Sequence, residues 1–411
     1  MRIPELLAPA GALPQLKAAL RFGADAVYGG LQRFGLRAFA GNFSMDDLAE
    51  AVGIAHKLQK RFYVTLNAFP FDDEMDGFIE TARAAHEIGV DAAIVSDLGA
   101  IRTLRKAVPA LDIHVSTQAN TLNTPAALAY AEMGVKRIIL ARELSLERMA
   151  NLRSRLTEAV ELEAFCHGAA CVSYSGRCLL SNVMTGRGAN QGACAQPCRW
   201  KYAVMEEKRP GEYYPVFEDA RGSYLFSAQD LNLMPLLPKL CATGLASLKI
   251  EGRMKTEYYV ATVVSAYRRG LDCLAAGGPE AFEALCPELL KELSKASHRQ
   301  SNTGFALGDR LPAAGAEGFH QSMEYVARIE EDAAAQTPCR VLLKNRFYTG
   351  DTLEVLSPSG ARSYVPDTIV LFASGERVQT HGVGGDMLLL TFPYAVQAGD
   401  FIRGPVRNHR L

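Results

Sequence analysis

Gly89-Val90-Asp91-Ala92-Ala93-Ile94-Val95 joins the end of a helical stretch to a short apolar strand, and this kind of junction determines the predicted architecture. A glycine suits the position after a helix because it accepts a left-handed backbone without steric cost. The apolar run that follows is short, as parallel strands buried on both faces are. The same pattern occurs at 23–28, 134–140 and 244–250. These four copies of one helix-to-strand junction predict a parallel α/β fold.

Counting all apolar runs of this kind gives eight candidate strands. They lie near 5–8, 25–29, 62–67, 91–96, 112–116, 136–141, 160–166 and 246–251. Helical stretches, including 12–22, 45–59, 74–88 and 124–133, lie between most of them, and Ser44 is placed to cap the second helix. Eight alternating units favour a (β/α)8 TIM-like barrel over residues 1–300. A doubly wound sheet is the alternative, but no glycine-rich phosphate loop follows the first strand.

Two regions depart from the repeat. Between 168 and 243 the periodicity fails, and Gly, Cys, Ser, Asn and Arg accumulate, which predicts a long cysteine-rich insertion within the barrel. From 310 to 411 short apolar runs alternate with Gly, Asp and Pro turns. This second pattern predicts a small C-terminal all-β domain that resembles a barrel.

The composition excludes several classes of protein. The chain has 411 residues, is 48% hydrophobic, and carries 44 basic against 45 acidic residues, for a net charge of −1. These values exclude a disordered chain and a polycationic coat protein for nucleic acid. The first residues do not read as a signal peptide, and no apolar run approaches the roughly 18 residues of a membrane span. We therefore expect a cytoplasmic protein without a membrane partner.

Cysteines cluster in the predicted insertion. Cys171, Cys178, Cys194 and Cys198 lie in a glycine-rich stretch that contains no Asp or Glu between 164 and 205. Four thiolates suit structural zinc or an iron–sulfur cluster, although the spacing differs from that of a usual zinc ribbon. Reduced structural thiols and a catalytic thiol are the other interpretations. The cations in the same stretch, such as Arg177, could balance a cluster or bind a phosphate or another anion.

Polar residues follow the predicted strands at the positions where barrel enzymes carry their chemistry. Lys249 and Glu251 are two residues apart, so both can face the barrel interior. A solvated loop residue or a satisfied ion pair is the alternative for each position. The residues at these strand ends include Asn67, Gln118, Arg142, Glu143, His167, Lys249, Glu251 and Arg253. The sequence contains no HExxH helix, no GxSxG elbow and no Walker loop.

Together, these motifs resemble the collagenase-like peptidase family, peptidase family U32, which includes bacterial tRNA hydroxylation proteins. The resemblance covers roughly 1–310. It is carried by Glu5-Leu6-Leu7-Ala8-Pro9-Ala10-Gly11, Ser116-Thr117-Gln118, Arg142-Glu143, His167-Gly168, the segment from Cys171 to Trp200, Lys249-Ile250-Glu251-Gly252-Arg253-Met254-Lys255, Ser297-His298-Arg299 and Thr303-Gly304-Phe305. Two positions depart from the family pattern: Cys166 adds a fifth thiol, and Asn232 stands where some relatives have a cysteine.

The resemblance implies a function that spacing alone does not. It implies a 4Fe–4S cluster held by Cys171, Cys178, Cys194 and Cys198, and oxygen-independent, prephenate-dependent hydroxylation of a tRNA wobble uridine to 5-hydroxyuridine. The alternatives are a collagenase-like peptidase and a hydroxylase of ribosomal RNA or of a quinone precursor. The oligomeric state stays open. We assign catalytic roles to His167, Lys249, Glu251 and Gln118, and substrate binding to Arg142, Glu143, Arg177, Arg253 and Asn67.

Overall fold

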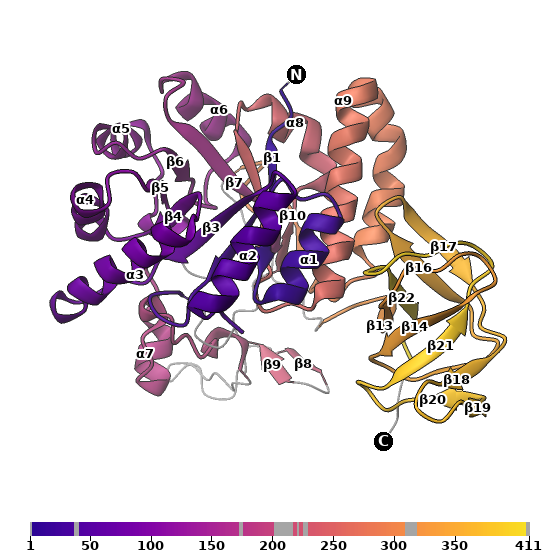
Figure 1. Cartoon of the computed structure of the whole chain (residues 1–411). Coiled ribbons are helices and arrows are strands. Elements are labelled where there is room, and N and C mark those ends of the chain that lie inside the picture. The colour runs from indigo at the N-terminus through magenta and orange to yellow at the C-terminus, as the bar shows by residue number, and fades with distance from the viewer. Residues whose placement is uncertain are drawn as a thin grey trace, which may run out of the picture.

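A closed barrel of eight parallel strands forms the larger part of the molecule (Figure 1). The computed structural model describes residues 2–36, 41–171, 176–200, 217–219, 222–224, 229–308 and 319–407. The barrel strands are β1 (Glu5–Ala10), β2 (Ala26–Gly30), β3 (Arg61–Leu66), β4 (Ala92–Val95), β5 (Asp112–Val115), β6 (Arg137–Ile139), β7 (Glu161–Ala169) and β11 (Ser247–Ile250). All eight coincide with predicted strands.

Strand β11 closes the barrel. It pairs in parallel with β1, where Leu7 lies opposite Lys249, and in parallel with β7, where Lys249 lies opposite Phe165. A doubly wound sheet would leave two open edges, so this double pairing confirms the predicted TIM-like barrel. Between Lys249 and Ile250 the register on β7 shifts by one residue, which marks a bulge at Cys166.

Helices cover the outside of the barrel. They are α1 (Leu13–Arg21), α2 (Met45–Lys57), α3 (Met75–Ile88), α4 (Leu98–Ala107), α5 (Thr124–Glu132), α6 (Leu146–Ser154), α8 (Leu237–Ala242) and α9 (Glu257–Leu293). Ser44 caps α2 as predicted: its Oγ accepts a hydrogen bond from Asp47 N at 3.1 Å, and Asp47 accepts one from Ser44 N. Helix α9 reverses its direction at Gly278, where φ is 72°. None of the described helices combines the length and apolar character that a membrane span requires.

The cysteine segment, as we call Cys171 together with residues 176–200, contains α7 (Leu180–Thr185), labelled in Figure 1, and contacts the loops at the carboxyl end of the barrel strands. Two of its glycines touch the barrel backbone. A Cβ on Gly176 would lie 2.3 Å from the carbonyl oxygen of Gln118, and one on Gly192 would lie 2.4 Å from that of Gly35. Only glycine permits such an approach, so these two residues fix the segment against the barrel mouth.

The rest of the predicted insertion is described in part. Within it, β10 (Asp230–Asn232) pairs antiparallel with β7. Strand β12 (Ser301–Asn302), which follows α9 in the chain, pairs in parallel with β10. Two further strands, β8 (Phe217–Asp219) and β9 (Gly222–Tyr224), form a separate hairpin. Residues 172–175, 201–216, 220–221 and 225–228 of the insertion lie outside the described residues.

The C-terminal region is all-β, as predicted. Its main sheet has the order β17-β16-β22-β13-β14-β21-β18-β19. Its strands are β13 (Met323–Ile329), β14 (Pro338–Leu343), β16 (Leu353–Ser357), β17 (Gly360–Tyr364), β18 (Ile369–Leu371), β19 (Arg377–Val378), β21 (Met387–Thr391) and β22 (Phe401–Pro405), beside a small pair of β15 (Phe347–Tyr348) and β20 (Thr380–His381). Among the described residues no pairing joins β17 to β19, so the sheet does not close as a barrel would. Alternating apolar residues occur in open and in closed sheets, so the sequence pattern does not indicate whether the sheet closes.

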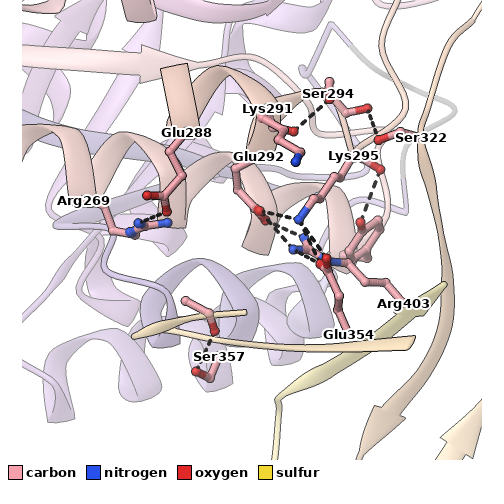
Figure 2. A network of polar contacts seen from close by, with 12 residues as sticks. Arg269, Glu288, Lys291, Glu292, Ser294, Lys295, Ser322, Glu354, Ser357 and Arg403 are labelled. Carbon is pink, nitrogen blue, oxygen red and sulfur yellow. Dashed lines mark hydrogen bonds and ion pairs between the residues drawn. The ribbon is translucent and has the colours of Figure 1, made fainter. Parts of the chain in front are cut away.

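A buried ion network, shown in Figure 2, fastens this β domain to helix α9 and the residues just after it. Arg403 on β22 is fully buried between Glu292 and Glu354, with nitrogen–oxygen distances of 2.9 and 2.7 Å. Lys295 completes the network at 2.8 Å from Glu354 and 3.1 Å from Glu292. The two positive and two negative charges balance, and each group has a partner, as buried charges require.

Candidate active site at the barrel mouth

A narrow cavity opens at the carboxyl ends of the barrel strands. Active sites of TIM barrels are built at this end from residues on several strands. The cavity is lined by Tyr28, Leu36, Thr65, Asn67, Ile94, Ser116, Thr117, Gln118, Ile139, Arg142, Phe165, Lys249, Glu251 and Arg253. Three cations and one carboxylate lie among these residues, so the lining as a whole favours an anionic ligand.

Lys249 forms part of the cavity wall and is nearly enclosed, with 3% of its surface exposed. Its ammonium lies 3.3 Å from Oε1 of the fully buried Glu163 and 4.0 Å from the centre of the Tyr28 ring. The contact with Glu163 is an ion pair without good hydrogen-bond geometry, because that oxygen has no hydrogen-bond partner. Burial lowers the pKa of Lys249, and the negative charge of Glu163 opposes this shift.

Glu163 extends the charge network toward the other end of the barrel. Its Oε2 lies 3.0 Å from a guanidinium nitrogen of Arg137, which also contacts Glu5 at 2.6 Å and Glu161 at 2.7 Å. Arg137 is 2% exposed. The sequence analysis missed Arg137 and Glu163. Their position in short apolar strands could have indicated a buried ion pair, because a charged residue inside such a strand needs a partner within the protein.

The other two cations of the cavity are held by neutral groups. Arg253 donates a hydrogen bond to Thr65 Oγ1 at 3.1 Å. Arg142 donates to the carbonyl oxygen of Ala169 at 2.7 Å, and its guanidinium carbon lies 3.9 Å from the centre of the Phe165 ring. Guanidinium groups oriented in this way can bind a carboxylate or a phosphate through two parallel hydrogen bonds.

Glu251 is the one acidic residue among the described residues of the lining. Its Oε2 accepts a hydrogen bond from the hydroxyl of Tyr28 at 3.2 Å, and the same hydroxyl lies 2.9 Å from the carbonyl oxygen of Ile250. Tyr28 therefore contacts Glu251 through its hydroxyl and Lys249 through its ring. A carboxylate and an ammonium in one cavity can together accept and donate protons.

The structure brings six of the nine predicted catalytic and substrate-binding residues to this cavity. They are Asn67, Gln118, Arg142, Lys249, Glu251 and Arg253. Glu143 and His167 are not among its lining residues, and Arg177 is exposed in the cysteine segment. The roles of all nine stay predictions.

His167 points away from the cavity because of the bulge on β7. Its ring packs against two tyrosines of α9, with a centre-to-centre distance of 5.5 Å to Tyr267 and 6.4 Å to Tyr259. Simple alternation along the strand would place His167 on the same face as Phe165. The extra residue at Cys166 turns the following side chain to the opposite face.

Acid is expected to destabilise the protein through His167. Burial lowers the pKa of His167 to about 4, so the unfolded chain, with an ordinary value near 6.5, binds the extra proton more readily. Stability contributed by the neutral imidazole is complete above pH 6.5 and is lost as the pH falls toward 4, by up to about 3 kcal/mol.

Urea titrations between pH 4 and 7 measure this loss. The His167→Gln variant lacks the titrating group, so its free energy of unfolding should fall less steeply over the same range. Parallel pH curves for the two proteins would contradict the assignment.

The four clustered cysteines all lie in the cysteine segment. Cys171 is exposed and the other three are half-buried, and a backbone N–H of Gln196 donates to Cys194 Sγ at 3.4 Å. Their donor chemistry suits iron or zinc. Within the described ranges, however, no three Cys, His, Asp or Glu side chains are gathered so as to hold a metal ion. Cys166 is buried, and its Sγ contacts the carbonyl oxygen of Lys249 at 3.5 Å.

The chain is similar in sequence to several known proteins. Residues 11–314, which include the whole cavity lining and the four cysteines, match the model of peptidase family U32. The chain is 35% identical over 407 residues to tRNA hydroxylation protein P of Escherichia coli (strain K12), covering 87% of both proteins. It is 37% identical over 270 residues to the 23S rRNA 5-hydroxycytidine C2501 synthase of the same strain, covering 66% of this chain and 39% of that protein. It is also 30% identical over 317 residues to the protein named collagenase of Porphyromonas gingivalis (strain ATCC BAA-308 / W83), covering 75% of this chain and 74% of that one.

Proposed function

Because the chain belongs to peptidase family U32, and two of its relatives are named for hydroxylation of RNA, we propose that it is an RNA-modifying enzyme that hydroxylates a tRNA uridine. The observation that carries this proposal is the cation-rich cavity at the carboxyl ends of the strands. An enzyme that acts on a base must take it out of the stack and into such a pocket. The finer proposal is conversion of the wobble uridine to 5-hydroxyuridine.

Each part of the lining then has a task. Asn67 and Gln118 offer amides that can pair with the polar edge of a pyrimidine base. Arg142 and Arg253 can hold the phosphate of the flipped nucleotide or the two carboxylates of prephenate, which we propose as co-substrate. Lys249 and Glu251 lie in the same cavity and can move a proton to or from the bound base.

Nucleoside analysis tests this proposal. The gene is expressed in an Escherichia coli strain that lacks its tRNA hydroxylation protein P and is grown without oxygen. Mass spectrometry of digested tRNA should then show nucleosides derived from 5-hydroxyuridine, and an empty vector should not restore them. Hydroxylated cytidine in ribosomal RNA, with unchanged tRNA, would move the assignment to the ribosomal substrate. A modified quinone precursor, with both RNAs unchanged, would contradict RNA as the substrate.

We further propose that Cys171, Cys178, Cys194 and Cys198 bind a 4Fe–4S cluster, which would supply electron transfer. This proposal rests on the chemistry of four thiols in a segment without acidic residues.

Cys178→Ser is expected to remove most of the iron and the broad absorption near 400 nm from protein purified without oxygen. Iron and sulfide content, together with the visible spectrum, measure this loss. Cys286→Ser on α9 is the matched control, because Cys286 lies outside the cysteine segment and should leave the iron content unchanged. Full iron content in Cys178→Ser, or zinc in the wild-type protein, would contradict the proposed ligand set.

Peptidase activity is the second candidate, and the relative named collagenase is the observation in its favour. The thiol adjacent to His167 does not support it. Cys166 is buried, and burial raises its pKa well above the usual value, which suppresses the nucleophilic thiolate. Gelatin hydrolysis by highly purified protein, abolished by a thiol-blocking reagent, would establish the peptidase instead.

A further inference from the structure

We infer that a second pocket beside the barrel mouth binds an unstacked RNA base next to the target nucleotide, with Phe319 as its stacking platform. The inference rests on the proposed function and adds a site that the cavity in the barrel does not include. The pocket is open to solvent and lies where the end of α9 meets the β domain. Its walls include Phe319, His298, His320, Ser297 and Ser322.

Phe319 is positioned as an aromatic platform. It is 40% exposed, so part of its ring is accessible to a ligand. The ammonium of Lys255 lies 4.8 Å from the ring centre, and the guanidinium carbon of Arg299 lies 5.9 Å from it. Both distances are within the range of cation–π attraction, which holds the ring in place.

The residues around Phe319 are also fixed. His298 and His320 exchange two backbone hydrogen bonds of 3.0 and 2.7 Å, and their rings lie 6.4 Å apart. Arg299 is held by the buried carboxylate of Asp230 through three hydrogen bonds of 2.8 to 3.0 Å. The platform is therefore ordered before a ligand arrives, which lowers the entropy lost on binding.

The second pocket is joined to the barrel cavity by a short turn. Arg253 lines the cavity, and Lys255, two residues later, contacts Phe319. The turn is tied by hydrogen bonds from Lys255 N to Gly252 O and from Lys255 Nζ to Ser297 O, both 2.9 Å long. Two residues span at most about 7 Å of backbone. A strand of RNA that leaves the cavity along this turn is directed toward Phe319.

The chemistry of the pocket selects a nucleotide over an apolar peptide. None of its described lining residues is acidic, and serine, glutamine and imidazole groups surround the one exposed ring. Proteins bind single-stranded nucleic acid by combining positive charge along the backbone with aromatic rings on which bases stack. Lys255 and Phe319 supply these two elements side by side.

Phe319→Ala is expected to weaken binding of an unmodified tRNA transcript about tenfold, which corresponds to the loss of one stacked base. Fluorescence anisotropy of the full chain, purified without oxygen, measures the dissociation constant. Phe319→Trp should bind as the wild type does, because its larger ring keeps the stacking surface. The salt dependence of binding should be the same in Phe319→Ala, since stacking releases no counterions.

Phe372→Ala is the matched control. Phe372 is 49% exposed and also lies near an arginine, with Arg340 at 5.9 Å, but it belongs to the far part of the β domain. Binding by this variant should be unchanged. Equal affinity of Phe319→Ala and the wild type would overturn the inference and leave the proposed function intact. A wild-type protein that binds no tRNA would overturn both.

Discussion

Replacing Lys249 by methionine is expected to reduce RNA hydroxylation at least about a hundredfold, the effect typical of losing a positioned charge or proton-transfer group. Lys249 lines the cavity, is almost fully buried, and has a pKa that burial lowers from its ordinary value. A buried ammonium with a lowered pKa gives up a proton more readily than an exposed one. Methionine keeps the length and apolar volume of the side chain while removing the charge. The measurement is the yield of 5-hydroxyuridine in tRNA.

The folded state of this variant has to be checked separately. Glu163 keeps its contact with Arg137 at 3.0 Å, so we expect Lys249→Met to unfold cooperatively. Lys239→Met on α8 is the matched control, because Lys239 is exposed and should leave the yield unchanged. Hydroxylation by Lys249→Met at the wild-type level would remove Lys249 from the predicted catalytic residues.

Replacing Arg137 by methionine is expected to lower the free energy of unfolding by about 3–5 kcal/mol, the usual loss when one partner of a buried ion pair is removed. The substitution leaves Glu163, which is fully buried, without its arginine, and Glu5 loses its contact of 2.6 Å. The urea midpoint at pH 7 measures the loss. A change below about 1 kcal/mol would show that water or the remaining cations replace Arg137.

The exposed pair of Arg340 and Glu331 provides the control for this experiment. Its distance of 2.8 Å matches the buried contacts, but the two side chains are 44% and 34% exposed. Arg340→Met should therefore change stability by less than about 1 kcal/mol.

The strands and helices could be predicted because their signals are local. The runs near 62–67 and 112–116 became β3 (Arg61–Leu66) and β5 (Asp112–Val115), and the cap at Ser44 forms as expected. In the β domain, apolar runs in the sequence at 341–344, 352–356 and 387–390 overlap β14, β16 and β21. Apolar run length, turn residues and helix caps are all properties of a few neighbouring residues.

The candidate site could be predicted only in part, because some of its features depend on contacts between distant segments. Lys249 and Arg253 were predicted from their position at the end of a strand. The role of Glu163 as the ion-pair partner of Arg137 and Lys249 becomes visible only in the folded structure. The orientation of His167 depends on a one-residue register shift against β11, which an alternating pattern does not reveal. The platform at Phe319 forms where three separate parts of the chain meet.

The buried network of Arg403, Glu292, Glu354 and Lys295 fixes the position of the β domain relative to the barrel. The β domain is set against α9 by these charges, and Val406, just after β22, forms part of the second pocket. The separation between the barrel cavity and that pocket is thus established before any substrate arrives. If both proposed sites bind RNA, an RNA would have to present its bases at this spacing to occupy both, and its folded shape would contribute to its selection.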